Sequence, residues 1–366
     1  MTRIAARRLA TVAAVVIATG CLSSALTNVS YRYYLWGPDS ALRALSSTEV
    51  EAADRSLVEL ERATILLELG RYRMSNEALA RAAAVLAEVP EPAGDPTVAG
   101  DRRPWLPAPY ERLLMDTMAM ANHLALQEPE EAVGAADRSL TAADRDECSS
   151  CEYAFTRVLA AIVDGEVGRY REGLAALAPL ELEGDAGELV ARLRARLAAG
   201  VAAAEPEGLA PPPVLGPRTL VAILLLGRGP DRGWQKIQVP GGQPMQWPMV
   251  LTRGPQAVGF ASFETEEPAV SVELTDVEAL AAASLEDAGE RFARSIASEP
   301  VAGRLDLRHW STLPASLQLL ELELEPETER VELVYWSPEG YGIDHEVIEA
   351  PPGWTGGRLF LTRRMP

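Results

Sequence analysis

The sequence is poor in several residue types that carry charge or chemistry. It has three cysteines, three histidines and, among its 34 basic residues, a single lysine, Lys236. Against 53 acidic residues this gives a formal charge of −19, which becomes −22 without the three arginines of residues 1–20. A surface this acidic repels the phosphates of nucleic acids and the headgroups of anionic lipids. We therefore expect no nucleic-acid partner, and no membrane attachment through a basic patch.

The few cysteines and histidines also limit metal and catalytic sites. A structural zinc site needs four ligands, and His123, His309 and His345 are widely separated in the sequence. We therefore expect no metal, no cofactor and no enzymatic activity. Hydrophobic residues make up 48% of the chain and charged residues 24%, which is ordinary for a folded protein. A length of 366 residues predicts about two domains.

The N-terminus combines a basic start with a short apolar run. Three arginines lie within Met1 to Arg8, Leu9 to Ala18 is apolar, and Ala18-Thr19-Gly20-Cys21 follows. This order is typical of a signal peptide. The residues before Cys21 resemble the bacterial lipobox, in which the cysteine is acylated and the chain is cut before it. Ala18 stands where lipoboxes usually have leucine.

The lipobox resemblance implies a signal peptide over 1–20 and lipidation of Cys21, with acyl chains such as palmitate holding the protein on a membrane. Leu22, in place of an aspartate retention signal, favours the outer membrane of the bacterial cell envelope, facing the periplasm. Two alternatives stay open. No charge interrupts Leu9 to Tyr31, so the segment could be an uncleaved anchor; or Cys21 could be incidental in an ordinary secretory signal.

Apolar residues at spacings of three and four predict helices from Ser47 to residue 204. The first helix ends at Gly70 and its partner continues through Leu86. Further helices are expected over 110–126, 129–143, 151–164, 169–177 and 187–204.

A six-residue sequence occurs twice where one predicted helix turns into the next. Glu68-Leu-Gly-Arg-Tyr-Arg73 matches Glu166-Val-Gly-Arg-Tyr-Arg171. The Leu-Gly turn, a tyrosine beside it and the small Ala82 resemble the tetratricopeptide repeat (TPR), although each tyrosine lies one place before the usual aromatic position. Stacked helix pairs bury an apolar stripe that one pair cannot bury alone. The resemblance implies an α-helical TPR-like domain over 39–204.

The pattern changes after the proline-rich linker 205–217. Apolar or alternating runs predict strands at 219–226, 235–239, 257–263, 269–274, 316–324, 330–336, 343–348 and 358–362. One amphipathic helix interrupts them, capped by Thr275 or Asp276. We therefore expect two domains: the all-α repeat at 39–204, after a lipidated tether at 21–38, and a mostly-β (α+β) domain at 218–366.

Cys148 and Cys151 form a CxxC motif, which can be a disulfide, a redox dithiol or half of a zinc site. In an exported protein a disulfide is the default. The acidic Asp144, Asp146 and Glu147 nearby disfavour a reactive thiolate. We expect a structural disulfide, with a redox role or a reduced or metal-bound pair as alternatives.

Other polar clusters are weaker signals. Leu226 to Pro230 followed by Lys236 lacks the Gly-Lys-Ser/Thr ending of a phosphate loop. Asp306, His309 and Ser311 lie within six residues, whereas catalytic triads converge from separate segments. Asp344-His345 has no evident partner. We expect structural roles for these residues.

Three segments (107–124, 220–239 and 306–324), together with the lipobox, resemble a family of proteobacterial TPR-like lipoproteins that has no established activity. This resemblance supports architecture and localisation only. We expect a membrane-anchored lipoprotein that binds an envelope protein as a scaffold or adaptor, through a groove of the helical domain. The alternatives are an envelope enzyme with a site in the C-terminal domain, near Asp306, His309 or His345, and a thiol-redox partner using Cys148 and Cys151.

Overall fold

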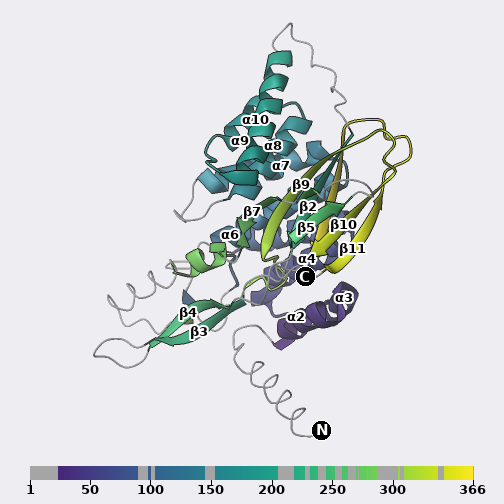
Figure 1. Cartoon of the computed structure of the whole chain (residues 1–366). Helices are drawn as coiled ribbons and strands as arrows, with labels where there is room; N and C mark the ends of the chain where they lie inside the picture. Colours follow the sequence, from purple (N-terminus) through teal and green to yellow (C-terminus); the bar gives the residue numbers. More distant parts are fainter. Residues whose placement is uncertain are drawn as a thin grey trace.

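A computed structural model of the chain is helix-rich up to residue 204, and strands dominate from residue 218 (Figure 1). This order of helices and strands agrees with the sequence analysis. The structure describes residues 24–89, 98–99, 104–144, 153–204, 218–226, 231–237, 245–251, 258–262, 269–270, 272–277, 279–286, 304–305, 309–336 and 342–365. Among these residues, no helix has both the length and the apolar character needed to cross a membrane.

The helices begin earlier than the sequence analysis expected. They are α2 (Ser24–Trp36), α3 (Pro38–Ser46), the 3-10 helix η1 (Ala52–Asp54), α4 (Arg55–Glu68), α5 (Tyr72–Ala87), α6 (Pro109–Ala125), α7 (Pro129–Asp144), α8 (Ala154–Glu166), α9 (Tyr170–Leu177) and α10 (Gly184–Ala204). The segment 21–38, expected to be a tether, thus contains α2. Ser47 follows α3 and does not cap the next helix, because α4 begins at Arg55.

Three helix pairs follow one another: α4 with α5, α6 with α7, and α8 with α9. Each pair is joined by the same turn. Gly70 and Gly168 have φ of +67° and +78°, and Gln127 takes the same left-handed conformation at +59°. In all three turns the next N–H donates to the carbonyl oxygen five residues earlier, at 2.7 to 2.9 Å. Because Gln127 stands where the other two turns have glycine, the turn between α6 and α7 has no recognisable repeat in the sequence.

The strands of the described residues form two four-stranded sheets and two short ribbons. One sheet has the order β12 (Arg358–Met365), β2 (Arg218–Leu226), β9 (Ser316–Leu324), β7 (Val272–Asp276); the other has the order β11 (Gly342–Glu349), β10 (Arg330–Trp336), β5 (Val258–Ser262), β6 (Ala269–Val270). The ribbons pair β3 (Asp231–Ile237) with β4 (Met245–Leu251), and β1 (Val98–Ala99) with β8 (Arg304–Leu305). Only β12 and β2 run parallel among these pairs.

The expected amphipathic helix follows β7, with residues 277 and 279–286 helical. Asp276 caps it, since its Oδ1 accepts the N–H of Ala279 at 3.1 Å. Val277, Leu280 and Ala281 are buried.

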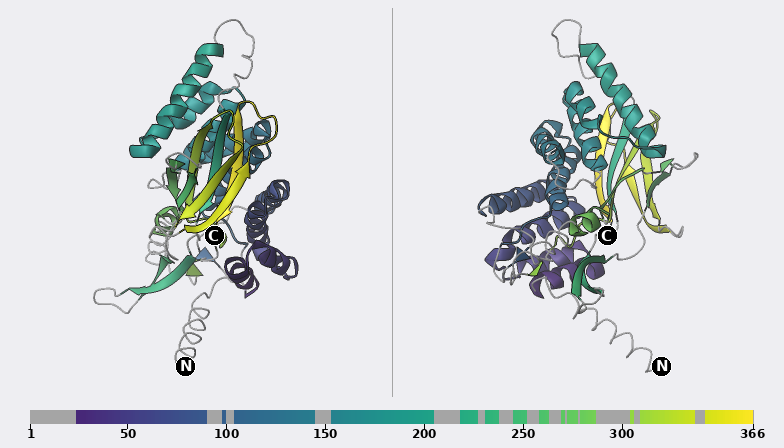
Figure 2. Two further views of the ribbon diagram at one scale, coloured as in Figure 1. Left: turned by 45° about the vertical axis from the view of Figure 1, so that its right-hand side comes forward. Right: turned by 90° about the vertical axis from the view of Figure 1, so that its left-hand side faces the viewer.

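Strand β2 is buried on both faces and divides the core into two parts. Leu220, Ala222 and Leu224 face Leu333 and Tyr335 of β10. These side chains fill the space between the two sheets. The other face, with Val221, Ile223 and Leu225, belongs to the large core that the helices build. The molecule is therefore layered, with helices on one sheet and the second sheet beyond it (Figure 2).

We call the sheet β12-β2-β9-β7 the inner sheet and the sheet β11-β10-β5-β6 the outer sheet. The first helix of each pair faces the inner sheet. Thr362 of β12 donates to the carbonyl oxygen of Ala121 in α6 at 2.9 Å, and the Phe155 N–H of α8 donates to Thr275 Oγ1 of β7 at 3.1 Å. α4 also contacts β12. One apolar core runs from Leu26 in α2 to Phe360 in β12, so the segments 39–204 and 218–366 share it.

Candidate functional site

The predicted lipidation and disulfide sites lie outside the described residues. These are Cys21, Cys148 and Cys151. The described helices begin three residues after Cys21, and Cys148 and Cys151 lie between α7 and α8. Arg157 of α8 donates to Asp144 at the end of α7 at 2.6 Å, which joins the two sides of this connection. Lipidation and the disulfide stay predictions.

Residues 309–315, which precede β9, are all buried, and His309, Ser311 and Thr312 among them are polar. Trp310 is 1% exposed, and its indole N–H donates to Thr64 Oγ1 of α4 at 3.0 Å. Tyr34 of α2 donates to the carbonyl oxygen of Ser311 at 2.8 Å. We call residues 309–315 the inserted segment, because α2, α4 and α6 surround its polar groups.

Two fully buried glutamates hold the main chain of the inserted segment. Glu61 of α4 accepts the Ser311 N–H and hydroxyl, both at 2.7 Å, and the Thr312 N–H at 3.2 Å. Glu111 of α6 accepts the Trp310 N–H at 3.0 Å and the Ala108 N–H at 2.7 Å. A carboxylate without such donors would be costly to bury.

The electrostatics of Glu61 reflect this arrangement. Burial raises the pKa of its carboxyl, while the hydrogen bonds from Thr312 and Ser311 and the proximity of His309 lower it. The Ser311 hydroxyl is directed at Glu61, and Ser311 is 3% exposed. A nucleophilic serine has to meet its substrate. The geometry of Ser311 instead fixes the inserted segment to α4.

A second buried cluster is centred on Arg364 of β12. Its guanidinium donates to the carbonyl oxygens of Leu225, Thr312 and Leu313, at 3.2, 3.3 and 3.3 Å. It also lies 5.9 Å from the ring centre of Tyr33, whose hydroxyl donates to Glu68. Burial raises the pKa of Tyr33 well above its usual range, and Arg364 opposes this rise. Arg364 therefore ties β2 and β12 to the inserted segment.

The structure does not bring the candidate catalytic residues together. His309 is buried and influences Glu61 on the helical side of the inner sheet. His345 is exposed on β11 in the outer sheet, opposite Val334. The two histidines thus lie on opposite sides of the paired sheets. Asp306 and the loop 227–230 fall outside the described residues, as does the side chain of Asp344.

Sequence reasoning missed Glu61, Glu111 and Arg364. A signal for Glu61 was present, because Leu57, Leu60, Glu61 and Thr64 share one helical stripe at spacings of three and four, and all are buried. A charge within an apolar stripe indicates a buried partner. Nothing local identifies that partner, since Ser311 lies 250 residues away.

Across the described residues, no three or more His, Cys, Asp or Glu side chains are grouped so that they could hold a metal ion. No protein-family model matches the chain, and no curated protein matches it either. A comparison with solved structures finds "MamA RS-1 ArsTM double mutant", at 13% identity and a TM-score of 0.32, over 50% of this chain and 95% of that one.

Proposed function

We propose that the protein is a lipid-anchored bacterial envelope protein, held by Cys21 in the outer membrane and facing the periplasm. Its helical part would act as a TPR-like scaffold or adaptor that binds an envelope protein. The signal-like residues 1–20 and the lipobox-like sequence before Cys21 support the anchor. The resemblance to proteobacterial TPR-like lipoproteins remains part of this proposal.

The observation that carries the scaffold proposal is the repeated helix pair. Three pairs share one turn geometry, and their first helices stack on a common sheet. Stacked helix pairs offer long surfaces for a protein partner. One face of the helices is covered, because the inner sheet and the inserted segment pack there. The partner surface we propose is therefore the outer one, formed by α5, α7 and α9.

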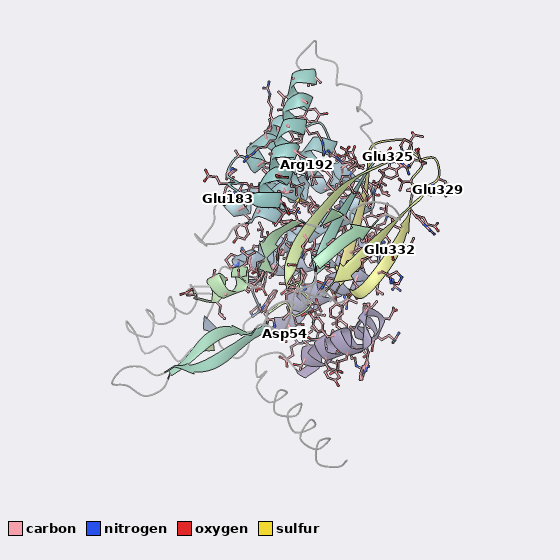
Figure 3. The ribbon with its side chains drawn as sticks, in the orientation of Figure 1. Asp54, Glu183, Arg192, Glu325, Glu329 and Glu332 are labelled. Atoms are coloured by element: carbon pink, nitrogen blue, oxygen red, sulfur yellow. The ribbon has the colours of Figure 1, made fainter. Side chains whose placement is uncertain are left out.

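The net negative charge of the protein indicates the charge of its proposed partner. A body with a formal charge of −22 favours a basic partner and resists non-specific association. Figure 3 shows Glu325 and Glu329 at the connection of β9 and β10, and Glu332 on β10, so acidic groups also lie on and beside the outer sheet.

The enzyme alternative has less support. Ser311 bonds Glu61 within the core, and His345 lies on the opposite face of the sheets. His345→Ala is the sharper test of this alternative, because His345 is exposed whereas His309 is buried and its loss would disturb folding. Loss of the cellular phenotype in His345→Ala would favour an enzyme. The thiol-redox alternative is tested by whether Cys148 and Cys151 cycle between oxidised and reduced forms in vivo.

The anchor is tested by detergent-phase partitioning of the wild type and Cys21→Ser, with Cys148→Ser as the matched cysteine control. We expect the wild type and the control in the detergent phase and Cys21→Ser in the aqueous phase. An unchanged distribution of Cys21→Ser contradicts lipidation.

The scaffold role is tested by photo-crosslinking from exposed positions of α5 and α7, followed by capture from solubilised envelope. Saturable crosslinking to one basic protein is expected. Equal labelling from these helices and from β11 would contradict the outer surface proposed here.

A further inference from the structure

Helix α2 has one buried face and one exposed apolar face. Leu26, Val29 and Tyr33 are each 1% exposed and pack into the core. On the opposite side, the exposed fractions of Tyr31, Leu35 and Trp36 are 46%, 57% and 59%. The exposed side follows helical spacing, since its members lie at i, i+3, i+4, i+7 and i+8. We call it the α2 stripe; it consists of Asn28, Tyr31, Arg32, Leu35 and Trp36.

The side chains of the α2 stripe contact one another. The Tyr31 and Trp36 rings meet edge to face, with centres 5.5 Å apart. The Arg32 guanidinium lies 5.2 Å from the centre of the Trp36 ring and donates to Asn28 Oδ1 at 3.1 Å. Tyrosine, tryptophan and arginine are the residues that favour the boundary between lipid tails and headgroups, because each has an apolar body and a polar tip.

Charge makes this helix unlike the rest of the chain. The sequence has 53 acidic residues, yet the first is Asp39, so α2 carries no negative charge. Its one charged residue is Arg32, which suits lipid phosphates. A helix free of acids can approach a membrane that the remaining surface would avoid. The acidic Glu325 and Glu329 lie toward the other end of the molecule (Figure 3).

The place of α2 in the chain and in the molecule also favours a membrane contact of the α2 stripe. Ser24, the first residue of α2, comes three residues after Cys21. α2 and α3 lie at one end of the molecule and α10 at the other, in all three views (Figures 1 and 2). Because α2 begins so soon after the predicted acyl group, the α2 stripe lies close to the membrane in which that group is anchored.

We propose that the α2 stripe lies in the headgroup region of the anchoring membrane, with α2 parallel to its surface, and so sets the orientation of the protein. This inference rests on the lipid anchor of the proposed function. The helix of 13 residues is about 20 Å long, at about 1.5 Å per residue. Only a parallel orientation puts both Asn28 and Trp36 at the same depth. Arg32 would meet a lipid phosphate while Leu35 and Trp36 enter the upper acyl region.

The test uses the full mature protein, purified with its anchor and reconstituted into vesicles of phosphatidylethanolamine and phosphatidylglycerol. A quarter of the lipids carry bromine near the headgroup end of the acyl chains, which quenches tryptophan at that depth. Trp36→Phe isolates the signal of Trp36 from that of the other tryptophans. Tyr31→Ser/Leu35→Ser removes its apolar neighbours. Val347→Ser, at an exposed apolar position on β11, is the matched control.

We expect bromine to remove more than half of the Trp36-dependent emission in the wild type and in Val347→Ser. The loss should be much smaller in Tyr31→Ser/Leu35→Ser. Unfolding midpoints close to that of the wild type would show that each variant folds, as the exposure of these side chains predicts.

Three results overturn the inference and can be told apart. If the wild type floats with the vesicles but bromine leaves Trp36 unaffected, the anchor stands and the α2 stripe does not meet lipid. If the wild type does not float with the vesicles, the lipid anchor fails and the inference fails with it. Crosslinking of a photoreactive residue at Leu35 to a protein in intact cells would also overturn it, because the stripe would then be a protein contact.

Discussion

The two copies of the six-residue sequence have the same backbone and different surroundings. In each, the arginine N–H closes the turn on a carbonyl oxygen five residues earlier, at 2.8 Å for Arg71 and 2.7 Å for Arg169. The first tyrosine, Tyr72, donates to the carbonyl oxygen of Thr362 in β12 at 2.9 Å. The second, Tyr170, packs its ring against Gly200 of α10. The same local sequence therefore builds the same turn, and distant segments decide what covers it.

Strand β12 links the two copies. At its start, Arg358 forms an ion pair with Glu166 of the second copy. Near its end, Arg364 lies close enough to Glu68 of the first copy to lower the pKa of that carboxyl, against the effect of burial. The two arginines differ in depth, because Arg364 is 4% exposed, whereas the side chains of Arg358 and its partner Glu166 are 14% and 25% exposed. Their removal should therefore have very different consequences.

The largest expected effect is that of Arg364→Met. It leaves buried carbonyl oxygens and Glu68 without their cation, and removal of one partner from a buried polar network costs about 3–5 kcal/mol. Arg358→Met removes a partly exposed pair and should cost about 1 kcal/mol or less. Urea unfolding of the two variants measures the difference. Equal losses would show that the two ends of β12 are held in the same way.

An intermediate effect is expected at the contact that distinguishes the second copy. A methyl group at Gly200 would lie 2.6 Å from Tyr170 Cδ1, so Gly200→Ala should separate α10 from α9 and cost about 1–3 kcal/mol. Gly134→Ala on α7 is the matched control, because its methyl would meet only Arg138 Nη1, at 3.5 Å. It should gain about 0.5–1 kcal/mol from helix propensity. A gain of stability in both variants would refute the close packing of α10.

The smallest effect concerns a buried carboxyl that lies two residues before the second copy and has no counterpart before the first. Asp164 and Leu66 occupy equivalent positions, since both supply the carbonyl oxygen that closes the turn. Burial raises the pKa of Asp164 from 3.8 to about 6, although Arg169 opposes the shift. Because the folded-state pKa lies above the unfolded one, this group favours folding most at low pH. That contribution is lost as the pH rises from about 4 through 6.

The stability of Asp164→Asn relative to the wild type should therefore be greater above pH 6 than at pH 4. We expect a gain of roughly 1 kcal/mol or less, because Arg169 loses its partner at 3.2 Å. Thermal unfolding at the two pH values measures it. A larger advantage for the variant at pH 4 than at pH 8 would mean that the charged form of Asp164 stabilises the fold.

Local patterns were enough to predict most of the elements. The continuous apolar run of β2 and the expected bounds of β9 and β10 match the structure. β4 was missed because Pro248 lies within it, and proline is tolerated there in a two-stranded ribbon. α2 was missed because aromatic residues occupy both of its faces, so that Tyr33 is buried while Tyr31 is exposed.

The buried polar clusters could not be predicted in the same way. Their partners meet across the whole chain, as Glu61 meets Ser311 and Tyr72 meets Thr362. A periodic pattern indicates which face of a helix is buried, but not which distant main-chain group will be there. The covered inner face of the helices follows from such pairings, and no local pattern indicates which face of the helical array stays free for a partner.

The central claim is that the mature protein begins at a lipidated Cys21. Mass spectrometry of the N-terminal peptide, prepared from protein purified out of native membranes, tests this claim most directly. We predict a peptide that starts at Cys21 and carries the mass of the diacylglyceryl and acyl groups. A peptide that starts at Met1, or an unmodified Cys21, would contradict the lipid anchor and with it the membrane position of α2.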